Sequence, residues 1–191
     1  KQKKYLVKIK LIIIIILLMD INQQTNELFK PNNVYNNPGN IEIGEGFAGG
    51  YEVTNKTYAD DRERPFVVFD SPEMGMRALA MDINSKLKQF NGNVSEIIKK
   101  YAPKEDENKT TNYVLYVQNK VGKKNITQND IGATIRAMIE FENKTEVADY
   151  YLSDPNKMKT ALALAFNEDG TNRQLDSNLS FEEAKEIAGL D

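Results

Sequence analysis

The chain lacks both cysteine and histidine among its 191 residues. Without cysteine it has no disulfide, no thiol nucleophile and no cysteine-ligated zinc site. Without histidine it lacks the usual base of serine and cysteine hydrolases and the zinc ligand of most metallopeptidases. Carboxylates, lysines or tyrosines would have to transfer the protons in any enzyme of this composition. Glycosidic bonds can be cleaved with carboxylates alone, because one protonated carboxylic acid performs the critical step.

Positive charge is scarce outside the N-terminal end. The first ten residues hold five lysines and no acid, whereas the net charge of the whole chain is −3. The remainder is therefore acidic, and it lacks the clustered Lys and Arg that phosphate contacts need. We expect no nucleic-acid partner, and no motif predicts a cofactor.

A run of Ile, Leu and Met over residues 11–19 follows these lysines and stops at Asp20. The run is shorter than the ~20 apolar residues that span a bilayer. A basic segment followed by a short apolar one is typical of export signals. We predict that residues 1–24 form a signal or membrane anchor, which places the protein in the periplasm or on the inner membrane. The alternative is a buried strand, because Ile-rich runs also favour strands.

The rest of the sequence predicts a mainly α fold with a minor β element. Asn-rich residues 22–40 and Gly-rich residues 44–51 indicate loops or a short hairpin, and residues 66–69 a strand. Helices are expected at residues 72–90, 94–101, 110–122, 131–143 and 156–166, and a short one after Ser180, from apolar periodicity and capping residues. We expect one domain over residues 25–166 and an acidic helical tail over 167–191. Six apolar residues of two helices should share one core: Met76, Leu79, Ile83, Leu87, Ile135 and Met138.

The helix expected at residues 131–143 carries the strongest chemical signal. Ile131, Ile135 and Met138 form one apolar stripe, and the next position of that stripe is Glu142. Glu140 points instead to the polar side. Partial burial of Glu142 would disfavour its ionised form and raise its pKa. A general acid that protonates a leaving group near neutral pH needs such a pKa. The alternative is a half-exposed Glu at a fraying helix end.

Several sequence blocks resemble virion-associated phage lysins, proteins often described simply as structural. In chain order the blocks are NNPGNI (36–41), GFAGG (46–50), FVVFDSPEMGMRA (66–78), YAP (101–103), ENKTTNY (107–113) and AMIEFEN (137–143). The resemblance implies a lysozyme-like, mostly helical domain that acts on peptidoglycan. Phe47 stands where that family usually has Trp, and Lys144 where Gly is common.

A second similarity concerns the order of the blocks. Bacterial glucosaminidases of the lysozyme superfamily have a helix that ends in a catalytic Glu, and an Asn-Asn block follows it. Here the Asn-Asn block comes first and the Glu-bearing helix comes late. We predict a circularly permuted order that brings Glu142 beside residues 36–41 in space. The resemblance implies that Glu142 is the catalytic acid.

The candidate substrate-binding residues lie mostly in these blocks: Asn36, Asn37, Asn40, Phe47, Glu73, Glu107, Asn108, Tyr113 and Asn143. Other interpretations remain open, since turns also favour Asn and an acid in a first helical turn favours the helix dipole. Tyr113 is equally plausible as a core residue. Glu107 is the candidate for a second carboxylate. A lytic transglycosylase needs none, because the sugar's own C6 hydroxyl attacks, so we favour this reaction slightly over hydrolysis.

The tail contains a degenerate EF-hand pattern. Asn172, Gln174, Asp176, Asn178 and Glu183 fall at loop positions 1, 3, 5, 7 and 12. With two formal charges, this loop predicts millimolar Ca²⁺ affinity at best. The alternative is a simple helix capped by Ser180 and Glu183. Because the phage resemblance ends near residue 145, we expect the tail to be dispensable for activity.

The sequence therefore favours a phage lysin that cleaves the glycan strands of bacterial peptidoglycan, as a lytic transglycosylase or a muramidase, and works as a monomer. Two alternatives remain. One is a virion or membrane-tethered structural protein that binds the cell wall without cutting it. The other is a peptidoglycan endopeptidase, which the lack of His and Cys makes the weaker alternative.

Overall fold

A computed structural model describes residues 35–42, 47–57, 63–102 and 107–190, with backbone alone for 51–57, 63–65 and 107–108. The described residues from Tyr35 onward form one compact unit. The predicted export or anchor segment and its boundary at residue 24 lie outside the described residues. Within the described part of the chain, no helix combines the length and the apolar character that crossing a membrane requires.

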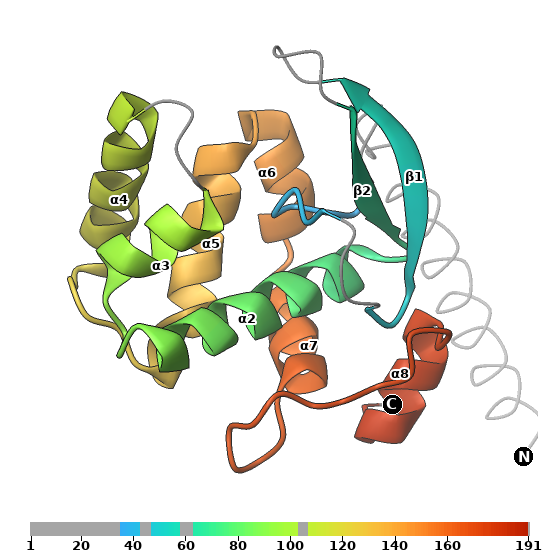
Figure 1. Ribbon diagram of the computed structural model, residues 1–191. Coiled ribbons are helices and arrows are strands. Elements are labelled where there is room, and N and C mark those ends of the chain that lie inside the picture. Colours follow the sequence, from blue (N-terminus) through green and yellow to red (C-terminus); the bar gives the residue numbers. More distant parts are fainter. Residues whose placement is uncertain (1–34, 43–46, 58–62, 103–106, 191) are drawn as a thin grey trace, which may run out of the picture. The chain divides into compact units, whose positions relative to one another are not determined.

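The described elements are mainly helical, as predicted (Figure 1). Strands β1 (Gly50–Thr57) and β2 (Glu63–Phe69) form an antiparallel pair in which Gly50 lies opposite Phe69. The helices follow in this order: α2 (Pro72–Gln89), α3 (Val94–Tyr101), α4 (Glu107–Val121), the 3₁₀ turn η1 (Gln128–Asp130), α5 (Ile131–Glu142), α6 (Thr145–Leu152), α7 (Pro155–Ala165) and α8 (Phe181–Ala188).

Side-chain caps explain why most predicted helix starts are correct. Ser71 accepts a hydrogen bond from the backbone N–H of Met74 at 3.2 Å, and Asn93 and Asp154 cap α3 and α7 in the same way. Helix α6 was not predicted. Lys144, the residue before it, provides no side-chain cap, so the usual start signal is missing.

Helix α2 is the centre of this unit. It packs against α7, α5, α3 and β2 (Figure 1). Five of the six predicted core residues are 0% exposed, namely Met76, Leu79, Ile83, Ile135 and Met138, whereas Leu87, near the end of α2, is half-buried. The apolar stripes of α2 and α5 therefore face a shared interior.

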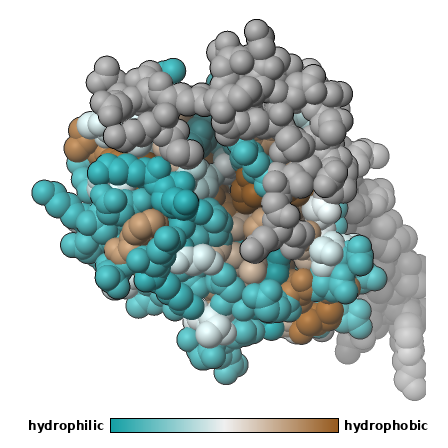
Figure 2. All heavy atoms as spheres, in the orientation of Figure 1, coloured by the Kyte–Doolittle hydropathy of each residue, from teal (hydrophilic) through white to brown (hydrophobic). Residues whose placement is uncertain are grey.

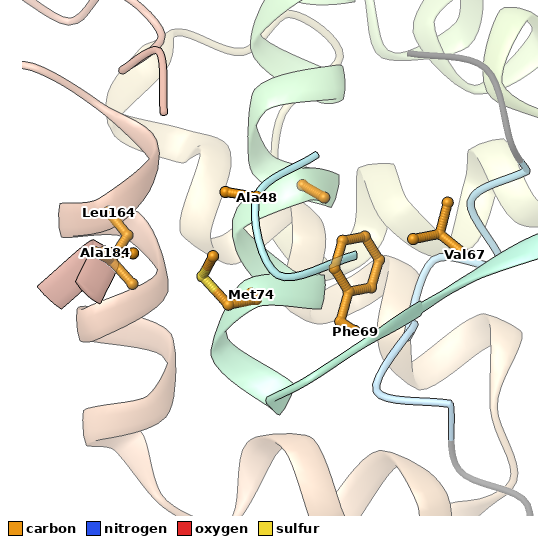
Figure 3. Packing of buried hydrophobic residues seen from close by; sticks show 7 residues of the cluster. Ala48, Val67, Phe69, Met74, Leu164 and Ala184 are labelled. Atoms are coloured by element: carbon orange, nitrogen blue, oxygen red, sulfur yellow. The ribbon is translucent and has the colours of Figure 1, made fainter. Parts of the chain in front are cut away.

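A further core cluster joins the β-hairpin side to the C-terminal tail (Figure 3). Phe69 and Met74 lie in it together with Leu164 of α7 and Ala184 of α8, and Ala184 is 0% exposed. The backbone N–H of Phe181 also donates to Asp70 Oδ2 at 2.8 Å. The tail is thus part of the compact unit, and its removal should destabilise the fold, whereas its dispensability for activity stays a prediction.

Candidate functional site

Glu142 is the last residue of α5 and is half-buried at the end of a buried stripe. Glu140 on the same helix has a different environment. Its carboxylate contacts Lys120 Nζ at 2.8 Å and accepts a hydrogen bond from the Tyr116 hydroxyl at 3.1 Å. The hydrogen bond from Lys120 lowers the pKa of Glu140, which therefore stays ionised. The two carboxylates of this helix are separated as the sequence predicted.

The loop of residues 35–41 meets the end of α5, as the permuted order predicted. Asn143, directly after Glu142, donates from Nδ2 to the carbonyl oxygens of Pro38 and Ile139, both at 2.9 Å. The hydroxyl of Tyr101, at the end of α3, donates to the carbonyl oxygen of Gly39. Helix α5, helix α3 and the loop therefore converge where Glu142 lies.

Two tyrosine hydroxyls lie close enough to Glu142 for its negative charge to raise their pKa. Burial, with a further contribution from that charge, raises the pKa of Tyr101 and Tyr113 well above the usual value of 10. Tyr113 is 2% exposed, and a hydrogen bond to the Glu142 side chain contributes to its raised pKa. Both hydroxyls stay neutral at physiological pH, and that of Tyr113 faces the Glu142 carboxyl group.

Aromatic rings border the same region. The ring of Tyr113 stacks on Phe141 with centroids 4.1 Å apart and planes 12° apart. Phe141 is 36% exposed and precedes Glu142 in the chain. The sequence did not indicate Tyr101 or Phe141 as site residues. Tyr101 begins the YAP block and Phe141 lies in the AMIEFEN block, but only contacts between separate helices bring the two side chains near Glu142.

The side chains of Asn36 and Asn37 form hydrogen bonds with backbone groups of the loop and of β2. Asn36 Nδ2 donates to the carbonyl oxygen of Phe69 at 2.9 Å. Asn37 Nδ2 donates to the carbonyl oxygens of Val67 and Ile41 at 2.8 and 2.9 Å, and its Oδ1 accepts from the Ile41 N–H. The two side chains are 4% and 8% exposed, so the structure favours their role in the turn over sugar binding.

Asn40 retains its place among the candidates. It is half-buried and, like Asn36, has a positive φ of 50°, which Asn tolerates better than most residues. Glu107 and Asn108 stand at the first turn of α4, but their side chains lie outside the described part. No geometry is therefore assigned to the predicted second carboxylate.

Glu73 belongs to a different group of side chains. It lies in the first turn of α2, where burial raises its pKa, and its charged neighbours are Lys157 and Asp154. Burial and the charge of Glu73 raise the pKa of Tyr150, whose hydroxyl donates to Asn36 Oδ1 at 3.1 Å. Glu73 thus lies near polar and charged side chains of α6 and α7.

Phe47 lies against the hairpin side of the core. Its ring packs edge-on against Phe69 with centroids 6.3 Å apart, and it is a partly buried neighbour of the core cluster that contains Phe69. It lines a surface hollow that also contains Arg77. Its role in substrate binding stays a prediction.

The tail forms the capped helix that the sequence offered as the alternative to a calcium loop. Ser180 and Glu183 cap α8 reciprocally, since Ser180 Oγ accepts from the Glu183 N–H and Glu183 Oε2 accepts from the Ser180 N–H at 2.8 Å. The side chain of Asn172 bonds to Met81 and Ser85 of α2. Among the described residues, no group of three or more acidic side chains is arranged to hold a metal ion.

Comparison with known proteins gives one informative match. The chain is 35% identical over 119 residues to Protein P5 of Pseudoalteromonas phage PM2, which covers 60% of this chain and 72% of that protein. No family model matches the sequence.

Proposed function

This chain belongs to the same family as Protein P5 of Pseudoalteromonas phage PM2, and we propose that it cleaves the glycan strands of bacterial peptidoglycan with Glu142 as general acid. The observation that carries the proposal is the position of Glu142. It ends a fully buried helical stripe, and three separate segments of the chain converge on it.

The two carboxylates at the end of α5 have different neighbours. Lys120 pairs with Glu140 and keeps it ionised, and the neutral hydroxyls of Tyr101 and Tyr113 lie near Glu142. The Tyr113 hydroxyl, which lies within hydrogen-bonding reach of Glu142, can donate to the carboxylate after proton transfer. In this proposal Glu142 protonates the glycosidic oxygen, and the bond from that oxygen to the anomeric carbon breaks.

The reaction we favour is that of a lytic transglycosylase. Inverting and retaining hydrolases both need a second carboxylate within about 5–9.5 Å of the acid. Of the described acids, Glu140 is paired with Lys120, and Glu73 interacts with Lys157 and Tyr150. In a transglycosylase the C6 hydroxyl of the sugar attacks the anomeric carbon instead, and its proton must pass to a base. Ionised Glu142 can accept that proton.

The test compares purified Glu142→Gln protein with a matched Glu140→Gln control on isolated peptidoglycan. Gln is nearly isosteric with Glu but donates no acidic proton. We expect Glu142→Gln to lose at least about 100-fold of the lytic rate, in line with the usual contribution of general acids. Glu140→Gln should retain activity within a few-fold, because its carboxylate faces Lys120.

Mass spectrometry of the products identifies the bond that is cut. Anhydro-muropeptides support the transglycosylase, and reducing ends support a muramidase. Cut peptides with intact glycan would identify an endopeptidase instead. If the protein binds the wall tightly but no variant releases any product, the protein is a structural wall-binding protein of the virion and not an enzyme. Equal lysis by wild type and Glu142→Gln would exclude Glu142 as the acid.

A further inference from the structure

Unpaired polar atoms concentrate where α2 meets the segment after α7. In the part of the chain that the structure describes, three buried side-chain atoms without a hydrogen-bond partner lie here: Arg77 Nη1, Asn84 Oδ1 and Arg173 Nε. A buried charged donor without a partner is costly, so such groups usually have a ligand, a water or an ion beside them. This concentration distinguishes the region from the rest of the described interior.

Arg77 is the most unusual of the three. Its side chain is 1% exposed. Nε donates to the carbonyl oxygen of Leu164 at 3.1 Å and Nη2 to that of Arg173 at 2.9 Å, which holds the guanidinium in place. Burial and the nearby guanidinium of Arg173 lower its pKa to about 10. It therefore stays charged at neutral pH, and no described carboxylate pairs with it.

Arg77 lines a hollow of about 440 Å³. Polar side chains from α2 and the tail border it, among them Asp82, Ser85 and Gln174, and apolar ones complete the lining: Phe47, Ala48, Met81 and Leu175. Asp82 is bound by Lys86, so its charge is already balanced within α2. The hollow thus combines an uncompensated, rigidly held cation with an apolar wall.

We propose that this hollow binds a small ligand through one carboxylate group, which accepts a hydrogen bond from Arg77 Nη1. The apolar wall accommodates the body of that ligand. A monoanion fits better than a phosphate dianion because Arg77 offers a single free nitrogen and Asp82 stands on the same lining. The carboxylate can come from the end of a peptide or from a free organic acid. The site does not depend on Glu142 or on the proposed glycan cleavage.

The experiment is a titration of the full chain followed by the arginine Nε–H signals in NMR, which are few because the sequence contains five arginines. N-acetylalanine represents a peptide end, lactate a free acid, N-acetylalaninamide a neutral control and orthophosphate a dianion. We expect N-acetylalanine or lactate to shift the Arg77 signal in a saturable way. The neutral amide should bind at least about tenfold more weakly, and phosphate should be weaker than the better carboxylate. The tighter of the two carboxylates identifies the source.

Substitution at the rim tests the site without disturbing buried Arg77. Gln174 is exposed, and Gln174→Glu should weaken carboxylate binding about threefold to tenfold through like-charge repulsion. The same change at Gln89, which is exposed but does not line the hollow, should leave it unchanged. Glu142→Gln protein should bind the carboxylate like wild type. A failure of carboxylate binding therefore refutes the Arg77 site alone, and a failure of the lysis test refutes the role of Glu142 alone. Equal binding of the amide, an unmoved Arg77 signal at saturation, or tighter binding of phosphate would overturn the proposal.

Discussion

Replacing Asn143 by Asp should detach the loop of residues 35–41 from the end of α5. The amide Nδ2 of Asn143 donates at 2.9 Å to two carbonyl oxygens, those of Pro38 and Ile139. Asp has nearly the same shape but, when ionised, no donor. Its carboxylate oxygens would then face two acceptors, so the loop would lose its attachment beside Glu142.

The magnitude follows from the two bonds. Each hydrogen bond contributes about 0.5–1.5 kcal/mol net, so Asn143→Ala should cost about 1–3 kcal/mol of unfolding free energy. Asn143→Asp should cost ~2–4 kcal/mol at pH 8, since a half-buried carboxylate without donors adds a desolvation penalty. That environment raises the pKa of the new Asp above its unfolded value of about 3.9. The penalty is then smallest below that value and grows as pH rises through the folded pKa.

Urea unfolding of wild type and both variants at pH 4 and pH 8 measures these differences. Asn112→Asp is the control, because Asn112 is exposed on α4 and should change stability by no more than about 0.5 kcal/mol. A cost for Asn143→Asp below 0.5 kcal/mol at pH 8, or a cost that is larger at pH 4, would refute the assigned contacts.

Three further outcomes are expected. Ile135→Ala, at a side chain that is 0% exposed, should cost about 2–5 kcal/mol in denaturant unfolding, and a value under 0.5 kcal/mol would place α5 at the surface. Deleting residues 168–191 should lower the thermal midpoint by several degrees, because Ala184 is buried against the body; an unchanged midpoint would make the tail an appendage. If Glu142 is the acid, cleavage of a neutral chitooligosaccharide should fall as pH rises between 5 and 9. The raised pKa of Tyr113 keeps that hydroxyl from titrating there, so a flat profile would argue against general-acid catalysis.

The described surface exposes few large apolar side chains. The face shown in Figure 2 is mostly hydrophilic, with separate hydrophobic patches among the described residues. Large apolar side chains that are well exposed include Leu115 and Ile187, which belong to α4 and α8. Neither lies among the residues on which the two proposals rest.

The sequence by itself determined the helices that carry local signals. Apolar periodicity and capping residues act within one or two turns, so Ser71, Asp154 and Ser180 predicted helix starts that the structure confirms. The same local logic separated Glu142 from Glu140 on α5. It missed α6, whose start has no capping side chain, and most of β1, because pairing with β2 decides that strand.

Tertiary structure decided which of these elements form a site. Asn143 and Pro38 are 105 positions apart, and Arg77 and Leu164 are 87 apart, so no local pattern reports their contacts. The similarity to glucosaminidases, with a permuted order predicted for this chain, placed the loop of residues 36–41 beside the end of α5, whereas nothing in the sequence predicted that Arg77 would be buried without a carboxylate. The side chains of Asn36 and Asn37 were ambiguous for the same reason. An amide can bind a sugar or a backbone carbonyl, and the packing of the loop against β2 determines which of the two it meets.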